Sequence, residues 1–224
     1  MPARYEALLE EWPREALLYI PKLPGFIASA ATREDVLELS LEALDLHLAW
    51  LTGHGHPPSL PHHAGIVVVE ALTAPKPGIG PRFDADLVEL PPDDLEHALS
   101  LGRVVLSDTI EAYDEVAALG ADQKELDRIL RHVAELDRWY AARLEGVIEA
   151  TATATVPDPF DAMIQAAAAF EDAVDEHVGS RRPQISIIGG EEWTLTKAIR
   201  RRTAHLREHC FEIVDLGSTR DDEE

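Results

Sequence analysis

The chain has 224 residues and a formal net charge of −22, because 42 acidic side chains outnumber 20 lysines and arginines. This negative surplus repels a phosphate backbone, so we expect no nucleic-acid partner. No apolar run approaches the roughly 20 residues that cross a bilayer, and no secretory leader is recognisable. The single cysteine, Cys210, excludes an internal disulfide framework. Together these features predict a cytoplasmic protein without a membrane segment.

The first 72 residues predict a small α+β domain. Four short segments rich in apolar and β-branched residues are separated by turn residues, which is typical of strands. They are residues 4–12, 15–20, 26–31 and 64–72. Thr32 opens a helix between the third and fourth segments, with Asp35 in the third helical position. The predicted order is β-β-β-α-β, and one apolar helix face is formed by Val36, Leu39, Ala43, Leu46 and Trp50.

A change in composition marks the end of this domain. Residues 73–92 are rich in proline and glycine, which predicts a linker, and residues 83–90 within it are expected to pair as an edge strand. We expect an all-α up-down four-helix bundle over residues 93–217, then a disordered acidic tail at 218–224. The predicted helices span residues 93–117, 122–146, 158–178 and 194–217. Their expected first residues or caps are Asp93, Asp122, Asp158 and Thr194.

Two histidines lie four residues apart in the last predicted helix. At about 100° per residue, His205 and His209 fall on or beside its apolar stripe. Burying two imidazoles without partners would cost about 1–3 kcal/mol each, whereas an i, i+4 pair presents two nitrogens to one metal ion. We expect a third ligand from a facing helix, where His132 flanks the apolar stripe. The alternative is that His132 is a surface residue and the pair a chance match.

The order of these features resembles the DinB-like (YfiT-like) superfamily of four-helix bundles. The matching features are a lone histidine in the second helix, a Trp-Thr pair at residues 193–194, and H-x-x-x-H in the last helix. The resemblance covers residues 93–217 and implies a divalent metal, typically zinc, nickel or iron, often in a homodimer. The implied ligands are His132, His205 and His209. Three imidazoles leave coordination positions open, and some family members activate a low-molecular-weight thiol there.

Four other side chains near the histidine pair are of interest. Arg202 lies on the same side of the helix as His209 and is predicted to bind an anionic substrate through its planar fork of donors. Alternatively it reaches solvent or pairs with a buried carboxylate. Glu208 and Glu212 either orient the imidazoles or are ordinary solvated residues. Cys210 points away from His209 and is interpreted as a packing thiol. No catalytic residue is assigned.

A second group of histidines lies in residues 54–63, which carry four of them in a proline-rich loop. These rings either bind a metal adventitiously or belong to a plain surface loop. We expect the surface loop, because no regular element fixes the rings.

Residues 19–51 resemble the HicB-like antitoxin domain. The resemblance implies a small sheet with a helix on one face, which in the family binds a small toxin protein. Lys22 and Phe26 replace the usual aspartate and cysteine, and no DNA-binding segment follows. We therefore expect a docking or dimerisation module that has kept the fold. The matching residues are Pro21, Leu23, Pro24, Gly25, Thr32, Glu34, Ala43, His47 and Leu48.

These observations give two hypotheses of function. The first is an enzyme, a metal-dependent transferase or hydrolase that activates a small thiol or water at the three-histidine site. The second is a non-catalytic protein-binding module, whose metal is structural or vestigial and whose N-terminal domain recruits a protein. A stoichiometric metal at an open site favours the first hypothesis, and capture of a small basic protein favours the second.

Overall fold

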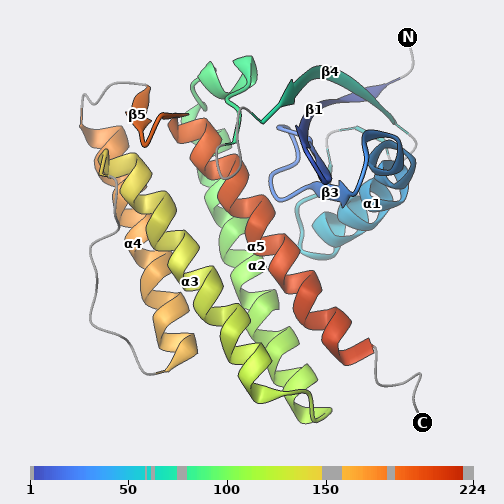
Figure 1. Ribbon diagram of the computed structural model, residues 1–224, viewed down its shortest axis with the longest axis vertical. Helices are drawn as coiled ribbons and strands as arrows, with labels where there is room; N and C mark the ends of the chain where they lie inside the picture. The colour runs from blue at the N-terminus through green and yellow to red at the C-terminus, as the bar shows by residue number, and fades with distance from the viewer. Residues whose placement is uncertain are drawn as a thin grey trace. The chain divides into compact units, whose positions relative to one another are not determined.

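The computed structural model describes residues 3–58, 60–61, 64–74, 80–147, 158–180 and 185–218. The chain divides into two compact units, Met1–Asp86 and Leu87–Glu224. The first unit holds a mixed four-stranded sheet with one helix, and the second is mainly helical (Figure 1). The predicted α+β segment followed by a helical region is therefore confirmed at this level.

The sheet of the first unit has the strand order β3-β2-β1-β4. Neighbours β1 and β2 are antiparallel, as are β2 and β3, whereas β4 runs parallel to β1. A parallel neighbour needs a long crossover, and helix α1 supplies it between β3 and β4. The elements are β1 (Arg4–Trp12), β2 (Glu15–Tyr19), β3 (Ile27–Ala30), α1 (Arg33–Gly53) and β4 (Gly65–Thr73).

Helix α1 begins where predicted but buries a different face. The Thr32 hydroxyl oxygen accepts a hydrogen bond from the Asp35 N–H at 3.2 Å, as expected of a cap. Val36 of the predicted apolar stripe is buried, whereas Leu39 and Leu46 are 48% and 62% exposed, so the predicted stripe is wrong for these two residues. Leucines occur on several sides of this helix, and packing against β2 and β3 selects the buried face. The buried residues are Val36, Ser40, Leu44, His47, Leu48 and Leu51.

The edge strand predicted at residues 83–90 is also wrong, because the segment contains a short 3₁₀ helix, η1 (Asp84–Leu87). The buried Asp86 carboxylate accepts from the Phe83 N–H at 3.0 Å, and the Glu70 carboxylate accepts from the Asp84 N–H. The bond between Asp86 and Phe83 is local, and such bonds from side chain to backbone offer an alternative to strand pairing.

Four helices lie alongside one another in the second unit (Figure 1). Helix α3 packs against α4 and α5, and α2 packs against α5. Much of the core lies between these helices and includes Tyr140, Phe170, Val174, Trp193 and Ile199. The helices are α2 (Pro92–Ala118), α3 (Gln123–Glu145), α4 (Pro159–Gly179) and α5 (Leu195–Ser218).

Three of the four predicted helix starts in the second unit are confirmed and one is wrong. The Thr194 hydroxyl oxygen accepts a hydrogen bond from the Lys197 N–H at 3.0 Å at the start of α5. The carboxylates of Asp122 and Asp158 accept hydrogen bonds from backbone N–H groups in the first turns of α3 and α4. Asp93 is not a cap, because α2 begins at Pro92 after Pro91 and has no side-chain cap. Proline suits this first position, because an N–H group there would have no hydrogen-bond partner within the helix and proline lacks that group.

A short hairpin before α5 was not predicted. Strands β5 (Ser186–Ile188) and β6 (Glu191–Trp193) pair across Gly189 and Gly190, which have φ angles of 62° and 86°. Glycine adopts such left-handed angles without steric penalty, so this pair forms the tight turn. The buried Trp193 anchors the hairpin against Trp139 and Tyr140. The hairpin fixes where α5 starts, and hence where its histidines lie.

Several predictions fall on residues that the structure does not describe. Residues 219–224 of the expected acidic tail lie outside the described residues, while Ser218 ends α5. In the histidine-rich loop, His62 and His63 lie outside them as well. In the described part of the chain, no helix combines the length and apolar character needed to cross a bilayer.

Candidate metal centre

Helices α3 and α5 face each other along a line of polar side chains. As residue numbers rise in α3 they fall in α5, so the two helices are antiparallel. The line places a histidine cluster between two groups of ion-paired residues. Its cross-helix contacts, in α3 order, are Arg128–Glu212, His132–His209, His132–His205 and Asp137–Arg202.

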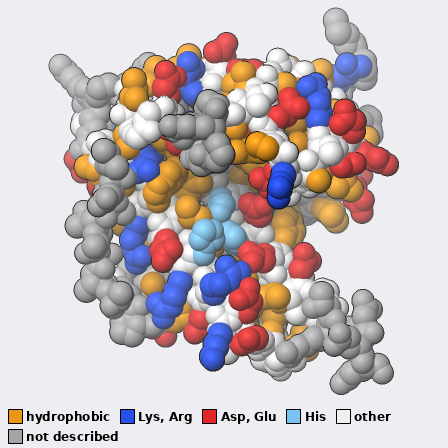
Figure 2. Space-filling view, viewed as in Figure 1, with side chains coloured by type: hydrophobic (Ala, Val, Ile, Leu, Met, Phe, Trp, Pro, Cys, Tyr) orange, Lys and Arg blue, Asp and Glu red, His pale blue; other side chains and the backbone are white. Residues whose placement is uncertain are grey.

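The structure brings together the three histidines singled out in the sequence. The ring centroid of His132 lies 5.5 Å from that of His205 and 4.9 Å from that of His209, and the last two are 4.2 Å apart. One ligand nitrogen can be chosen from each ring such that all three lie within 4.8 Å of one another. All three side chains are half-buried, and Figure 2 shows histidines reaching the surface of the face that carries α3 and α5.

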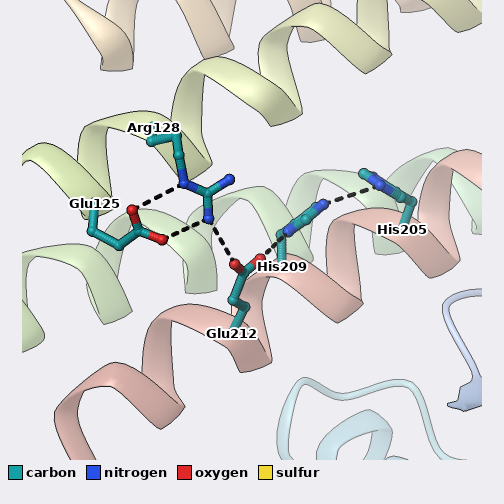
Figure 3. A network of polar contacts seen from close by, with 5 residues as sticks. All are labelled: Glu125, Arg128, His205, His209 and Glu212. Carbon is teal, nitrogen blue, oxygen red and sulfur yellow. Dashed lines mark hydrogen bonds and ion pairs between the residues drawn. The ribbon is translucent and has the colours of Figure 1, made fainter. Parts of the chain in front are cut away.

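The hydrogen bonds of His209 define its tautomer (Figure 3). Its Nδ1 lies 2.5 Å from Oε2 of Glu212, and its Nε2 lies 3.0 Å from Nε2 of His205. A carboxylate only accepts hydrogen bonds, so Nδ1 of His209 carries the proton. Its Nε2 therefore presents a lone pair toward His205, whose Nε2–H donates to it.

Glu212 is held in turn by an arginine from the facing helix. Its Oε1 accepts from Nη2 of Arg128 at 3.0 Å, and Arg128 also pairs with Glu125 at 2.7 Å (Figure 3). The side chains of Arg128 and Glu125 are 53% and 43% exposed. Ion pairs this exposed contribute little to stability.

The environment keeps the imidazoles of α5 neutral. Burial is the main cause that lowers the pKa of His205 to about 3, and the nearby charges of His209, His132 and Arg201 lower it further. Burial also lowers the pKa of His209, although its bond to Glu212 opposes this shift. Neutral imidazole is the form that binds a metal, so both rings have the required charge at neutral pH. For a metal to bind Nε2 of His205, the proton of that ring moves to Nδ1.

The spacing of the nitrogens fits a metal ion after small side-chain movements. Two imidazole nitrogens on a tetrahedral zinc, each about 2.0–2.1 Å from the ion, lie about 3.3 Å apart. The observed separation of the two Nε2 atoms is 3.0 Å, and the longest nitrogen separation in the cluster is within 4.8 Å. Small rotations of the histidine side chains about their χ angles can lengthen the 3.0 Å separation and shorten the longest one. The donor set of three nitrogens suits zinc, nickel or iron.

Arg202 is buried in an ion pair with Asp137. Its Nε and Nη2 donate to the two carboxylate oxygens of Asp137 at 2.9 and 2.7 Å, and its Cζ lies 4.5 Å from the centre of the Phe170 ring. The side chains of Arg202 and Asp137 are 3% and 2% exposed. The structure thus shows the alternative that the sequence left open, a buried ion pair with a carboxylate.

A glycine in α2 leaves room for this ion pair, which the sequence did not reveal. A Cβ placed on Gly102 would lie 2.9 Å from Nη1 of Arg202. The sequence did contain one signal of close packing, a glycine inside a predicted helix. Glycine is about 1 kcal/mol less favourable there than alanine, so its presence indicates that a neighbouring group lies close to the backbone.

The remaining residues near the pair are placed as follows. Glu212 is the carboxylate bonded to His209, and Glu208 is half-buried. Cys210 is buried, and burial raises the pKa of its thiol. Its burial agrees with its interpretation as a packing thiol. In the histidine-rich loop, Nδ1 of His54 lies 3.0 Å from the backbone oxygen of Trp50 at the end of α1.

The cluster has the chemical properties of an open metal site. Three nitrogen donors converge from two helices, and the half-buried rings remain accessible from solvent. Since a divalent ion takes four or more ligands, such a set leaves positions for water or substrate. Comparisons with protein-family models, curated proteins and solved structures gave no significant match to the chain.

Proposed function

We propose that the chain is a metal-dependent transferase or hydrolase acting on a small molecule, with a divalent ion bound by His132, His205 and His209. The observation that carries the proposal is the convergence of three ligand nitrogens to within 4.8 Å. Three imidazoles directed at one point form a donor set that a zinc, nickel or iron ion binds.

The surroundings of the cluster favour an open site over a closed structural one. Glu212 is engaged at Nδ1 of His209, on the opposite side of the ring from Nε2. Arg202 is engaged with Asp137. Neither side chain is directed to complete the coordination. A divalent ion there would supply Lewis acidity, which lowers the pKa of a small thiol or water toward neutrality. The protein's contribution is to hold three imidazoles in place.

The same features support a family assignment as part of the proposal. We infer that the second unit is a DinB-like bundle, supported by the lone histidine of α3 and by Trp193-Thr194 preceding α5. The β-β-β-α-β order of the first unit supports a HicB-like domain. A single cysteine, buried in the fold, supports a cytoplasmic protein.

Metal content and affinity test this proposal. Tag-free protein is stripped with a chelator, reloaded with Zn²⁺, and analysed for bound metal and for its far-ultraviolet circular dichroism. We expect one equivalent per chain, lost in His209→Ala and in His132→Ala with the helical signal unchanged. Absence of stoichiometric metal from the wild type would contradict the proposal.

A second candidate function rests on the first unit. Leu39 and Leu46 of α1 lie seven residues apart, and therefore on one helix face, and they are 48% and 62% exposed. Exposed leucines on one helix favour a docking surface, and the net charge of −22 would steer a basic partner toward the chain. If this function holds, a small basic protein binds the wild type and not the Leu39→Glu/Leu46→Glu double variant.

A further inference from the structure

We infer that Glu212 is a positioning residue for the proposed metal site, and that Arg128, itself held by Glu125, keeps Glu212 in place. This inference rests on the proposed function, because it concerns how a metal ligand is oriented. It adds three residues outside the ligand set, and it explains why the ligand His209 presents Nε2 and not Nδ1.

The first step is the contact between Glu212 and His209. They lie three residues apart on α5, a spacing that places side chains on one helix face, and Oε2 is 2.5 Å from Nδ1. The carboxylate accepts the Nδ1 proton and leaves the Nε2 lone pair free for a metal. A carboxylate in this position also raises the electron density of the ligand nitrogen.

The second step is the link from Glu212 to the facing helix. A glutamate at the helix surface has several rotamers of similar energy, and fixing one of them costs conformational entropy. Nη2 of Arg128 donates to Oε1 of Glu212 at 3.0 Å, while the other carboxylate oxygen remains on His209. The carboxylate therefore bridges an imidazole of α5 and a guanidinium of α3. This selects one rotamer of Glu212.

The third step is the anchor of Arg128 itself. It donates to Glu125, one turn earlier in α3, through Nη2 at 2.7 Å and Nε at 3.0 Å. A residue of its own helix thus orients the guanidinium toward Glu212. Figure 3 shows the resulting chain of contacts, Glu125, Arg128, Glu212, His209 and His205.

The bridge also keeps Glu212 from becoming a fourth ligand. The two nitrogens of an imidazole point to opposite sides of the ring, so a carboxylate bonded at Nδ1 is turned away from an ion at Nε2. With Glu212 held there, the coordination remains three nitrogens and open positions. Without Arg128, the carboxylate would be free to leave Nδ1.

Zinc affinity of the full-length, tag-free chain tests the inference, measured by competition with a chromophoric chelator. We expect Glu212→Gln to weaken Zn²⁺ binding about tenfold and Glu212→Ala up to about 100-fold, because outer-shell partners of metal-bound histidines have effects of this size. The control is Asp215→Asn, which removes one negative charge from an exposed position of the same helix. It should change the affinity by less than about twofold, since exposed charges are screened by salt.

Coupling between the helices gives a second readout. Arg128→Met should weaken Zn²⁺ binding by less than Glu212→Ala. The Arg128→Met/Glu212→Ala double variant should bind as the Glu212→Ala variant does, because the two residues act through one contact. Additive losses would overturn the role of Arg128.

The tautomer of His209 is a further readout, and a change in fold stability alone does not alter it. In metal-free protein, two-dimensional nuclear magnetic resonance of the ¹⁵N-labelled imidazole should show the proton on Nδ1 in the wild type. Glu212→Ala should shift the population toward the Nε2–H form, and circular dichroism checks that α5 is retained. An unchanged tautomer would overturn the inference.

The outcomes separate the inference from the proposal beneath it. If the wild type binds Zn²⁺ and His209→Ala does not, but both Glu212 variants bind as tightly as the wild type, the inference fails and the proposed function stands. If the wild type binds no Zn²⁺, both are overturned.

Discussion

Asp137 of α3 and Arg202 of α5 form a buried, bidentate ion pair beside the histidine cluster, with donor–acceptor distances of 2.9 and 2.7 Å. Both side chains are almost fully enclosed. Burying a charge is unfavourable unless a partner satisfies it, so each residue requires the other. The pair therefore fixes the register of α5 against α3, and with it the position of His205 opposite His132.

Breaking this ion pair should destabilise the fold strongly. Asp137→Ala leaves the Arg202 charge buried without its carboxylate, which costs about 3–5 kcal/mol in comparable cases. Chemical denaturation followed by circular dichroism measures the free energy of unfolding. As a control, Glu125→Gln removes an exposed carboxylate and should lower the free energy of unfolding far less than Asp137→Ala does. Equal losses in the two variants would show that burial of the pair is not decisive.

Substituting Gly102 should destabilise the protein in spite of helix propensity. Alanine is about 1 kcal/mol better than glycine in a helix interior, but its Cβ would lie 2.9 Å from Nη1 of Arg202. The end of an arginine usually moves aside easily, whereas this one is held by Asp137 and lies against Phe170. We expect Gly102→Ala to lower the free energy of unfolding relative to the wild type.

Two controls make that prediction specific. Gly179→Ala, at the end of α4, meets nothing within 4 Å and should be neutral or slightly stabilising. In an Asp137→Ala background the guanidinium can shift, so the loss caused by Gly102→Ala should shrink. If Gly102→Ala proves stabilising in the wild type, the close approach to Arg202 is not a constraint.

The pKa of His205 predicts how the stability of metal-free protein depends on pH. Its pKa falls from 6.5 to about 3 on folding, mainly through burial, so the unfolded chain binds a proton more readily than the folded one. The stabilising effect is complete above about pH 6.5 and is lost as the pH falls toward 3. The slope from one such group is at most about 1.4 kcal/mol per pH unit.

A comparison with His205→Gln isolates this effect. Glutamine does not titrate, so the variant lacks the contribution of that ring while keeping every other acid-sensitive group. Denaturation at pH 7 and pH 5 with chelator present should show the wild type losing about 1–2 kcal/mol more than the variant. If the wild type and the variant lose the same free energy of unfolding between pH 7 and pH 5, the lowered pKa of His205 is not the cause.

The helix boundaries and the histidine cluster were predictable because their signals are local. An aspartate before an apolar run marks a helix start, and Asp122 and Asp158 both cap as expected. A spacing of four residues on one helix brings His205 and His209 together whatever the tertiary structure. His132 followed from the expectation that α3 faces α5, since it is the one histidine of that helix.

Other features depend on contacts that no local signal encodes. Arg202 pairs with a residue 65 positions away, so its choice between substrate and carboxylate is a tertiary property. The buried face of α1 depends on which side meets the sheet. Arg128 and Glu125 look like an ordinary surface pair in the sequence, and only the facing helix gives them a connection to His209.

An anomalous diffraction experiment at the zinc edge, on crystals of the zinc-loaded full chain, tests the central claim most directly. We predict one strong peak about 2.0–2.1 Å from a ring nitrogen of each of His132, His205 and His209. Nδ1 of His209 should remain hydrogen-bonded to the carboxylate of Glu212. A peak at another location, such as residues 54–63, or no peak at the three rings, would contradict it.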